Sequence, residues 1–507
     1  MQLLIRRICR RLGGGWTVRG AIALIVLTAP LHATEAPLPP DAIAWLQRDG
    51  FGVDSDALAQ YRRLGREGLL DAQLGDRLGD TLPASVQAQL DGMDIRRLTP
   101  DALATTLGDA RRRLRALPQN DKRDARKALR QQGNALAEQA REEVLLRAVY
   151  GPNQLKEQMV WFWLNHFSVF AHKGEVNWLV ADYAERSIRP HALGKFRDLA
   201  MATLQSPAML VFLDNAQNAN DKLNENYARE LMELHTLGVD AGYTQQDVQQ
   251  LARILTGVGL APPPDGPRAR RRGPEPLGDG LAAFAPRRHD DSDKQLLGQR
   301  IPGDGFDEVR QAVDLIVRQP ACARFISRQL AEYFVSDTPP PALVERMAQT
   351  FQRSDGDIAQ VLRTLFTSPE LIASRGGKFK DPTQFVVSAV RLVAAGRPID
   401  DARPMARWLD QLGEPLFGRP TPDGWPLDGA SWSSAGQMTE RFAVARVIGN
   451  GRALWPNASD VRRIDGPLYQ ATLAPRLSAY TRAALAQASS PQEWNAFLLA
   501  SPEFNYR

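Results

Sequence analysis

The sequence has almost no cysteine, since Cys9 and Cys322 are the only two in 507 residues. Cys9 falls within an expected export signal, so we expect the mature chain to keep only Cys322 and to form no intramolecular disulfide. Cys322 stands in the amphipathic helical pattern QPACARFISRQLAEYFV. Free cysteines usually behave as small buried apolar residues, so the pattern predicts a buried thiol rather than a reactive one.

Long apolar runs are also missing, and the run at residues 21–27 is too short for a membrane-spanning helix. It follows five arginines and precedes Leu31-His32-Ala33, which offers a small residue for cleavage. This order is typical of an export signal, so we expect residues 1–33 to be a signal peptide. The mature protein, residues 34–507, is then periplasmic or secreted, without a stable membrane anchor. An uncleaved anchor is the alternative interpretation.

The mature chain has no excess of either charge. The full sequence has 63 Lys and Arg and 58 Asp and Glu, and the expected signal holds five arginines and no acid. Both kinds of charge therefore number 58 in the mature chain, and its formal net charge is zero. Without a basic footprint, nucleic acid is not an expected partner.

The common catalytic motifs are absent as well. The sequence contains no HExxH zinc helix, no Glu-x-x-His pair, no GxSxG elbow, no Walker loop and no GxGxxG. These absences argue against the enzyme classes that those motifs define. Paired carboxylates with histidine as general acid and base are the remaining chemistry for a catalytic site. No cofactor follows from these patterns.

Helical periodicity is what the sequence has in abundance. It predicts helices at residues 121–150, 152–170, 176–188, 191–205, 220–237, 244–256, 306–318, 321–335, 341–353, 357–367 and 383–395. The first of these is polar nearly all round in its first half, which predicts a solvent-exposed segment. Dense Pro, Gly and Arg predict an irregular loop at 261–280, and 281–301 fits a short hairpin. We therefore expect a mostly α fold: a single large multi-helix domain with long irregular loops and at most a short hairpin.

The stretch LNENYARELMELHTLGV, residues 223–239, carries a dense polar pattern. At 100° per residue, one arc of the helix collects Glu225, Asn226, Arg229, Glu230 and Glu233. The opposite side is apolar, and His235 falls on it. One interpretation of the arc is a solvated face with an i,i+4 ion pair between Glu225 and Arg229. The other is a functional face.

The segment MVWFWLNHFSVF, residues 159–170, is apolar on nearly every side, so we expect a buried helix. Asn165 and His166 are then buried with it. Each needs a partner, because an unpaired buried amide or imidazole costs about 1–3 kcal/mol. The acidic arc is the best supply of partners, so we predict that the two helices cross and that His166 lies against the arc, shielded from water. A structural hydrogen-bond network without chemistry is the alternative.

Residues 224–257, NENYARELMELHTLGVDAGYTQQDVQQLARILTG, closely resemble the signature of a bacterial family known as domain of unknown function 1800 (DUF1800). The resemblance extends to MVWFWLNHFSVF, to HDDSDKQLLG (residues 289–298), to GEPLFGRPTPDGWP (413–426) and to the closing SPEFNYR. It implies a helical, often exported protein and favours a functional pocket. Members of the family often occur beside a second exported family with a sulfatase-like fold, so a co-exported sulfatase-like protein is an expected partner.

The signature spreads the expected site over three segments of the chain. The catalytic candidates are His166, Glu230, Glu233 and His289. The surrounding pocket is expected to include Asn165, Asn224, Glu225, Asn226, Arg229, His235 and Asp290. A metal held by His166, a glutamate of the arc and the His289 segment is an alternative, because zinc accepts mixed histidine and carboxylate ligands.

Two functions of different classes follow from this pocket. The first is a hydrolase-like enzyme that acts on an envelope or extracellular polymer such as a polysaccharide. The second is a non-catalytic partner or maturation factor of the sulfatase-like protein. Convergent polar groups that solvent reaches favour the enzyme, and a dry network beside an exposed apolar patch favours the partner.

Overall fold

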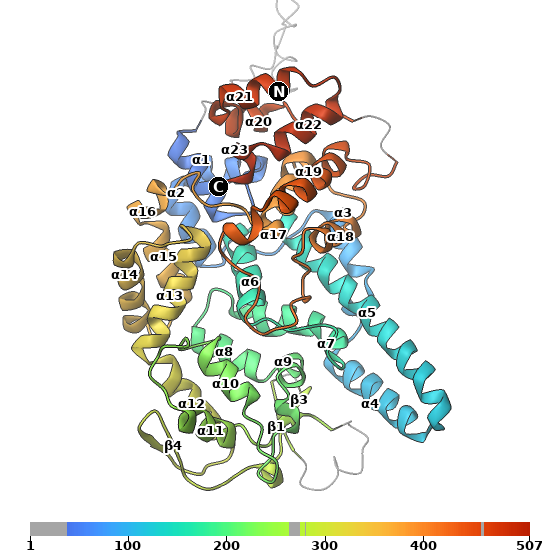
Figure 1. Ribbon diagram of the computed structural model, residues 1–507, viewed down its shortest axis with the longest axis vertical. Coiled ribbons are helices and arrows are strands. Elements are labelled where there is room, and N and C mark those ends of the chain that lie inside the picture. The colour runs from blue at the N-terminus through green and yellow to red at the C-terminus, as the bar shows by residue number, and fades with distance from the viewer. Residues whose placement is uncertain (1–37, 263–273, 279, 458–460) are drawn as a thin grey trace, which may run out of the picture. The chain divides into compact units, whose positions relative to one another are not determined.

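The computed structural model describes residues 38–262, 274–278, 280–457 and 461–507, and Figure 1 shows their arrangement. Residues Leu38–Arg507 form one compact unit. The expected signal peptide, residues 1–33, lies outside the described residues. Most of the described chain is helical, which confirms the predicted fold class. No helix within the described ranges is long and apolar enough to cross a membrane.

The first half of the unit is a succession of helices joined by short turns. They are α1 (Pro40–Asp49), α2 (Ser55–Leu74), α3 (Ala84–Asp91), α4 (Pro100–Ala116), α5 (Gln119–Tyr150), α6 (Gln154–His166), α7 (Val176–Asp182), α8 (Phe196–Leu204), α9 (Pro207–Phe212), α10 (Asn226–Glu233) and α11 (Gln245–Ile254). A π-helical turn, Tyr183–Ile188, continues α7.

The second half follows the same plan. Its helices are α12 (Phe306–Val317), α13 (Pro320–Phe334), α14 (Pro341–Arg353), α15 (Ile358–Phe366), α16 (Pro369–Ala373), α17 (Pro382–Ala394), α18 (Arg403–Gln411), α19 (Ala435–Asn450), α20 (Pro467–Thr472), α21 (Ala479–Ala486), α22 (Pro491–Ala500) and α23 (Pro502–Asn505). Antiparallel neighbours such as α13 and α14, and α14 and α15, pack directly against each other. Cys322 on α13 is fully buried, as predicted.

Two small antiparallel sheets interrupt the helices. The hairpin of β4 (Lys294–Leu296) and β5 (Gln299–Ile301) was predicted, whereas the three-stranded sheet was not. That sheet has the order β1-β3-β2, with β1 (Val258–Leu260), β2 (Glu275–Leu277) and β3 (Ala282–Phe284). β2 lies inside the loop predicted at 261–280, where surrounding Pro, Gly and Arg conceal a strand of only three residues. Residues 263–273 and 279 of that loop lie outside the described residues.

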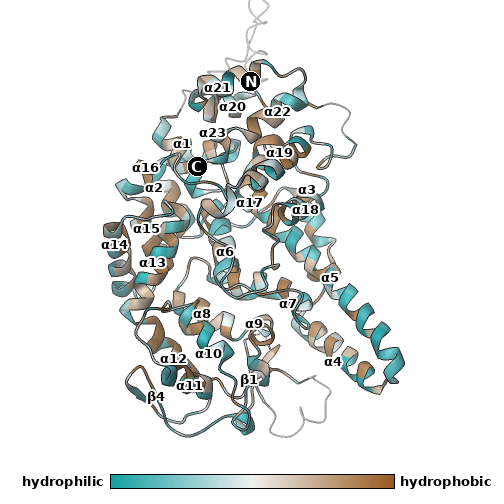
Figure 2. Ribbon diagram, viewed as in Figure 1, coloured by the Kyte–Doolittle hydropathy of each residue, from teal (hydrophilic) through white to brown (hydrophobic). Residues whose placement is uncertain are grey.

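Helix α5 is the long helix that the sequence predicts. It spans 32 residues, and its buried positions begin at Gly133. Figure 2 shows its first half in the hydrophilic colour, as the polar pattern requires. The second half packs against α7 and α17. Helix α5 therefore joins a solvated arm to the core.

Helix α6 is buried along its whole length, which confirms the burial predicted for its apolar pattern. Its polar residues have partners: Gln158, for example, accepts hydrogen bonds from the Tyr333 hydroxyl and the Gln384 amide. The helix ends at His166, and not at Phe170 as predicted. Phe167 leaves the helical conformation, and its carbonyl accepts a hydrogen bond from the Tyr183 hydroxyl at 2.6 Å. A tertiary partner thus replaces the next helical turn.

Candidate functional site

The end of α6 contacts the chain that follows α10, whereas the sequence predicted that His166 lies against the acidic arc of that helix. Nε2 of His166 lies 2.9 Å from the backbone oxygen of His235, which follows α10. Nδ1 of His166 lies 2.7 Å from the side-chain amide of Gln329 on α13. His166 is buried, and its ring contacts Trp163 and Phe167. Its partners are thus an amide and a carbonyl, and neither is a carboxylate of the α10 arc.

Burial keeps the His166 imidazole neutral. It lowers the pKa of His166 to about 4, against the raising effect of the two hydrogen bonds. Nδ1 faces Oε1 of Gln329 and Nε2 faces the His235 carbonyl oxygen. A neutral ring carries one N–H, so it donates to only one of these two oxygens. The two contacts leave no free ring nitrogen for proton transfer.

His235 is the second buried imidazole of this region. Its ring centroid lies 6.0 Å from that of His166 and 5.0 Å from that of Phe167. Neither of its ring nitrogens makes a hydrogen bond of normal geometry to a described residue, although the backbone of Pro422 lies close enough to raise its pKa. Burial and the neighbouring His166 outweigh that effect and lower the pKa of His235 to about 3. The pair is therefore buried and uncharged at neutral pH.

Asn165 fastens the loop of residues 413–426 to the end of α6. Its side-chain amide donates to the carbonyl of Trp425 at 2.9 Å, and its side-chain oxygen accepts from the Trp425 backbone N–H at 2.6 Å. Gly424 packs so closely that a Cβ there would lie 2.3 Å from the Asn165 carbonyl oxygen. The two hydrogen bonds with Trp425 satisfy the polar side chain of the buried Asn165.

The polar arc of α10 faces outward. The predicted ion pair is present, with Nη2 of Arg229 3.2 Å from a carboxylate oxygen of Glu225. Glu230 and Glu233 are partly exposed, and neither carboxylate has a hydrogen bond or ion pair to a described residue. Partial burial and the neighbouring Glu233 raise the pKa of Glu230. Asn224 and Asn226 make hydrogen bonds with the nearby residues 213–218.

His289 occupies a third, separate environment. Its Nε2 lies 2.9 Å from Glu308 on α12, and its Nδ1 lies 2.8 Å from the Thr256 carbonyl. Lys294 binds the other oxygen of Glu308, and the side chains of His289, Lys294 and Glu308 are all shut away from solvent. Asp290 pairs with Arg253 at 2.8 Å, and this contact with the Ser292 bonds holds the pKa of Asp290 well below its usual range. The predicted His289 segment is thus an internal ion cluster.

The sequence-predicted residues therefore do not form one pocket. His166, Asn165 and His235 come together, the glutamates of α10 face outward beside them, and His289 and Asp290 have partners of their own. Within the described ranges, no three His, Cys, Asp or Glu side chains are grouped to hold a metal ion. The ligands proposed for a shared metal are not assembled in this structure.

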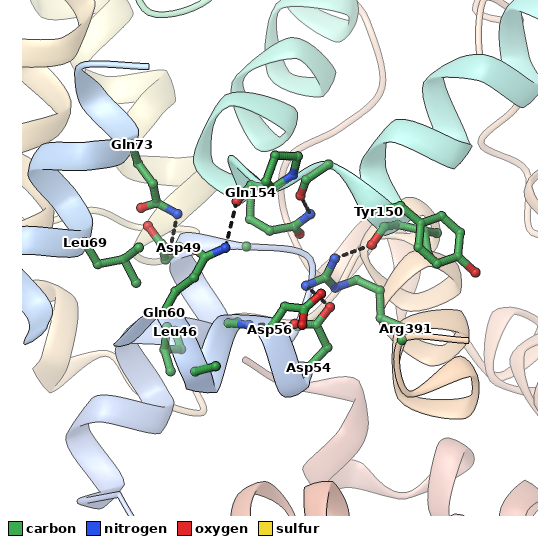
Figure 3. Close-up of a pocket in the computed structure, with 18 of the residues that line it drawn as sticks. Leu46, Asp49, Asp54, Asp56, Gln60, Leu69, Gln73, Tyr150, Gln154 and Arg391 are labelled. Atoms are coloured by element: carbon green, nitrogen blue, oxygen red, sulfur yellow. Dashed lines mark hydrogen bonds and ion pairs between the residues drawn. The ribbon is translucent and has the colours of Figure 1, made fainter. Parts of the chain in front are cut away.

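A polar cavity of about 500 Å³ lies instead between α1, α2, the end of α5, the start of α6 and the end of α17. We call it the Asp49 cavity, and Figure 3 shows its lining. The side chains that carry its chemistry are Asp49, Asp54, Asp56, Arg63, Gln73, Tyr150, Gln154 and Arg391. Its volume is that of a small-molecule or polymer-segment site.

Asp49 is the unusual group in this cavity. Its side chain is buried at the last residue of α1, where the negative end of the helix dipole disfavours a charge. Burial raises the pKa of Asp49 to about 7, although the Gln73 amide donates a hydrogen bond to Oδ2 at 2.8 Å. Oδ1 of Asp49 and Oε1 of Gln73 have no partner among the described residues. Two adjacent acceptors at the cavity wall therefore lack a donor.

The other side of the cavity is held by an ion pair. Nη2 of Arg391 lies 2.6 Å from Oδ2 of Asp54, and Oδ1 of Asp54 caps α2 by accepting from the Ala57 N–H at 2.9 Å. Figure 3 shows Arg391 reaching toward Asp54, across from Asp49 and Gln73. Asp56 on the next turn is exposed and has no hydrogen bond or ion pair to a described residue. The cavity thus combines a carboxyl that holds its proton near neutral pH with a free carboxylate.

Asp49 was not among the predicted site residues, because the stretch that it ends, DAIAWLQRDG, has the pattern of an ordinary helix. One local signal was present. An acid in the last turn of a helix opposes the helix dipole, so Asp49 directly before Gly50 marks a carboxyl whose charge is disfavoured. The other walls come from residues far along the chain, and no local pattern predicts them.

One known protein family matches nearly the whole chain. A family model described as protein of unknown function (DUF1800) matches residues 44–506. No curated protein and no solved structure matches the chain. The match extends from α1 to the C-terminal segment and includes every candidate residue named above. The chain therefore belongs to the DUF1800 family, as its resemblance to the family signature predicted.

Proposed function

We propose that the protein is an exported hydrolase-like enzyme that acts on an envelope or extracellular polymer and that the Asp49 cavity is its active site. The observation that carries this proposal is Asp49, whose pKa is raised to about 7 at the wall of a polar cavity. Perturbed carboxyls in cavities are typical of general acids. The proposal moves the chemistry away from His166, whose ring nitrogens are both engaged.

The residues support acid–base hydrolysis by two carboxyl groups. Asp49 in its protonated form gives a proton to the leaving oxygen of the substrate. Asp56 as a carboxylate takes a proton from the attacking water, so the bond is broken and both products are neutral. Such a pair is the arrangement that hydrolysis of a glycosidic bond uses. The Gln73 amide holds Oδ2 of Asp49, so Oδ1 is the oxygen that carries the proton.

The test is an assay of polymer cleavage by the purified mature protein. Reducing ends released from a panel of neutral and acidic polysaccharides are measured for the wild type, Asp49→Asn and Asp56→Asn. Loss of a general acid lowers the rate by about 100-fold or more. Asp124→Asn on the exposed half of α5 is the control and keeps the wild-type rate. The wild-type rate falls as pH rises through about 7, because Asp49 loses its proton.

Two results contradict the proposal. One is the absence of cleavage of any polymer in the panel. The other is an Asp49→Asn variant that is folded and as active as the wild type. Export is tested separately, by measuring the mass of the protein recovered from the periplasm or the medium. If the signal is cleaved, that protein lacks residues 1–33.

A second candidate is a non-catalytic partner of a co-exported sulfatase-like protein. The buried His166–His235 pair lies beside α10, and exposed apolar side chains flank that helix: Leu223 is 43% exposed and Val239 is 64% exposed. This combination favours a docking surface. A pull-down from the native envelope with wild type and with Leu223→Ser/Val239→Ser tests it. Recovery of no sulfatase-like protein by the wild type counts against this candidate.

A further inference from the structure

A second cavity, of about 730 Å³, lies between the end of α17, the turn after α19 and the start of α20. We call it the arginine cavity. Its lining includes Arg397, Arg452, Arg462 and Arg463 together with Trp455 and Tyr469. None of the described residues that line it is an aspartate or a glutamate. Four positive charges therefore surround one concave space in a chain whose mature net charge is zero.

Among the residues that the structure describes, which leave out 458–460, most of this charge is uncompensated. Arg452 and Arg462 are exposed, and neither side chain has a hydrogen bond or ion pair to a described residue. Arg463 is paired only loosely, with Nε 3.3 Å from Asp465, and its guanidinium lies 4.6 Å from the ring of Trp494. The guanidinium of Arg397 lies 4.7 Å from the ring of Trp455. Like charges that converge without counter-charges create a strong positive potential.

The walls that carry these arginines are fixed. Asn495 of α22 is 1% exposed, and its amide donates to the carbonyls of both Gly449 and Arg462, at 2.9 and 2.8 Å. Its side-chain oxygen accepts from the Ile464 N–H. The Trp455 indole donates to the Pro398 carbonyl at 2.8 Å. These bonds tie the two sides of the cavity together, so the arginine-bearing segments are preorganised for a ligand.

The chemistry of the wall defines the ligand. Guanidinium groups present paired N–H donors that match phosphate, sulfate and carboxylate oxygens. The volume exceeds what one inorganic anion fills and suits an organic ligand. Trp455 and Tyr469, which are 5% and 8% exposed, add only a small apolar surface to the lining. A concave site favours a soluble ligand over a flat lipid surface.

We propose that the arginine cavity binds a soluble saccharide that carries two or more oxyanion groups. This binding site stands independently of the hydrolysis proposed for the Asp49 cavity. The two cavities are neighbours, because Ala394 lines both and Ser55 of the arginine cavity lies between Asp54 and Asp56 of the Asp49 cavity. A polymer that is cleaved at Asp49 can therefore be held by its anionic groups at the arginines.

The test is calorimetric titration of the mature protein with inorganic pyrophosphate, a sulfated oligosaccharide and an oligogalacturonate. The wild type is compared with Arg452→Gln/Arg462→Gln. The control is Arg324→Gln/Arg328→Gln, which removes the same charge from exposed positions of α13. We expect at least one oligosaccharide to bind to the wild type and to the control within twofold. The cavity variant binds it at least tenfold more weakly, and added salt weakens the wild-type binding.

Several results overturn this inference. They are equal binding by the cavity variant and the control, no binding of either oligosaccharide by the wild type, or binding to phosphatidylglycerol vesicles alone. Binding of pyrophosphate alone also overturns it, because the ligand is then a small anion. Asp124→Asn, on the exposed half of α5, keeps wild-type affinity in this titration. The titration measures binding and not cleavage, so a failed cleavage assay does not decide the outcome here.

Discussion

Burial shifts the pKa values of three side chains, and the direction differs between the histidines and the aspartate. It lowers the pKa of His166 and His235 and raises that of Asp49, because a low-dielectric interior disfavours each charged form. At neutral pH the two imidazoles are therefore uncharged and lack the second ring proton that an imidazolium donates. Asp49 alone of the three is poised to exchange a proton near pH 7.

His235→Phe is expected to make the protein less sensitive to acid. The folded pKa of His235 is about 3 and the unfolded value is 6.5, so its contribution to stability is present above pH 6.5 and is lost as pH falls toward 3. Phenylalanine fills similar space and cannot be protonated. Relative to wild type, the variant gains about 2 kcal/mol in the free energy of unfolding between pH 8 and pH 5. Urea unfolding at both pH values measures this gain.

The control for this prediction is the exposed His172, where His172→Phe should leave the pH dependence as in wild type. A wild-type pH dependence in the His235→Phe variant would show that His235 is not buried in its neutral form.

At the scale of elements, single polar side chains hold long irregular segments onto helices. Asn165 holds the 413–426 loop on α6, and Glu308 holds the segment from His289 to the β4–β5 hairpin on α12. The loops have few regular hydrogen bonds of their own, so these contacts determine where they lie. Each contact is at least partly buried. Removal of one partner leaves the other polar group without a hydrogen bond, which lowers the stability of the protein.

Asn165→Ala is expected to release the loop around Trp425. Two hydrogen bonds are lost and a partly buried backbone N–H and carbonyl lose their partners, at a cost of about 1 kcal/mol. The Trp425 amide should exchange with deuterium faster than in wild type, as hydrogen-exchange mass spectrometry of that peptide measures. Asn120→Ala, at an exposed position of α5, should leave the exchange unchanged. Unaltered protection in Asn165→Ala contradicts the clamp.

Glu308→Gln is expected to destabilise the protein strongly. The change leaves Lys294 and His289 buried without their shared carboxylate, and loss of one partner from a buried ion cluster costs about 3–5 kcal/mol. Thermal unfolding measures the loss. The exposed pair of Asp293 and Arg300 lies on the same segment and provides the control, because Asp293→Asn should shift the melting temperature little. Equal melting temperatures for the two variants would refute a buried cluster.

At the scale of the whole molecule, the sequence predicted the elements better than the site. The helical class, the polar half of α5, burial of α6 and the β4–β5 hairpin follow from local periodicity. Burial of His166 follows from the apolar pattern as well, but its partners are the His235 carbonyl and Gln329 in place of the carboxylates expected from α10. The three-stranded sheet was missed because its strands have three residues each.

The Asp49 cavity was not predictable in the same way because it is a product of tertiary packing. Its walls bring together chain positions from Leu46 to Gly396. Asp49 owes its raised pKa to the depth at which α1 is packed, which local composition does not encode. Similarly, His289 resembles a site residue in the sequence, and only its contact with Glu308 identifies it as part of an internal ion cluster.

The most direct measurement is the pH dependence of stability in wild type and Asp49→Asn. The pKa of Asp49 is about 7 in the folded protein and 3.8 as the unperturbed value. The contribution of protonated Asp49 to the free energy of unfolding is therefore fully present below pH 3.8 and is lost as pH rises through 7. Relative to wild type, Asp49→Asn therefore gains up to about 4 kcal/mol between pH 4 and pH 8. Asp124→Asn shows no such gain. A difference between wild type and Asp49→Asn that stays constant from pH 4 to pH 8 would contradict a proton held on Asp49 near neutrality.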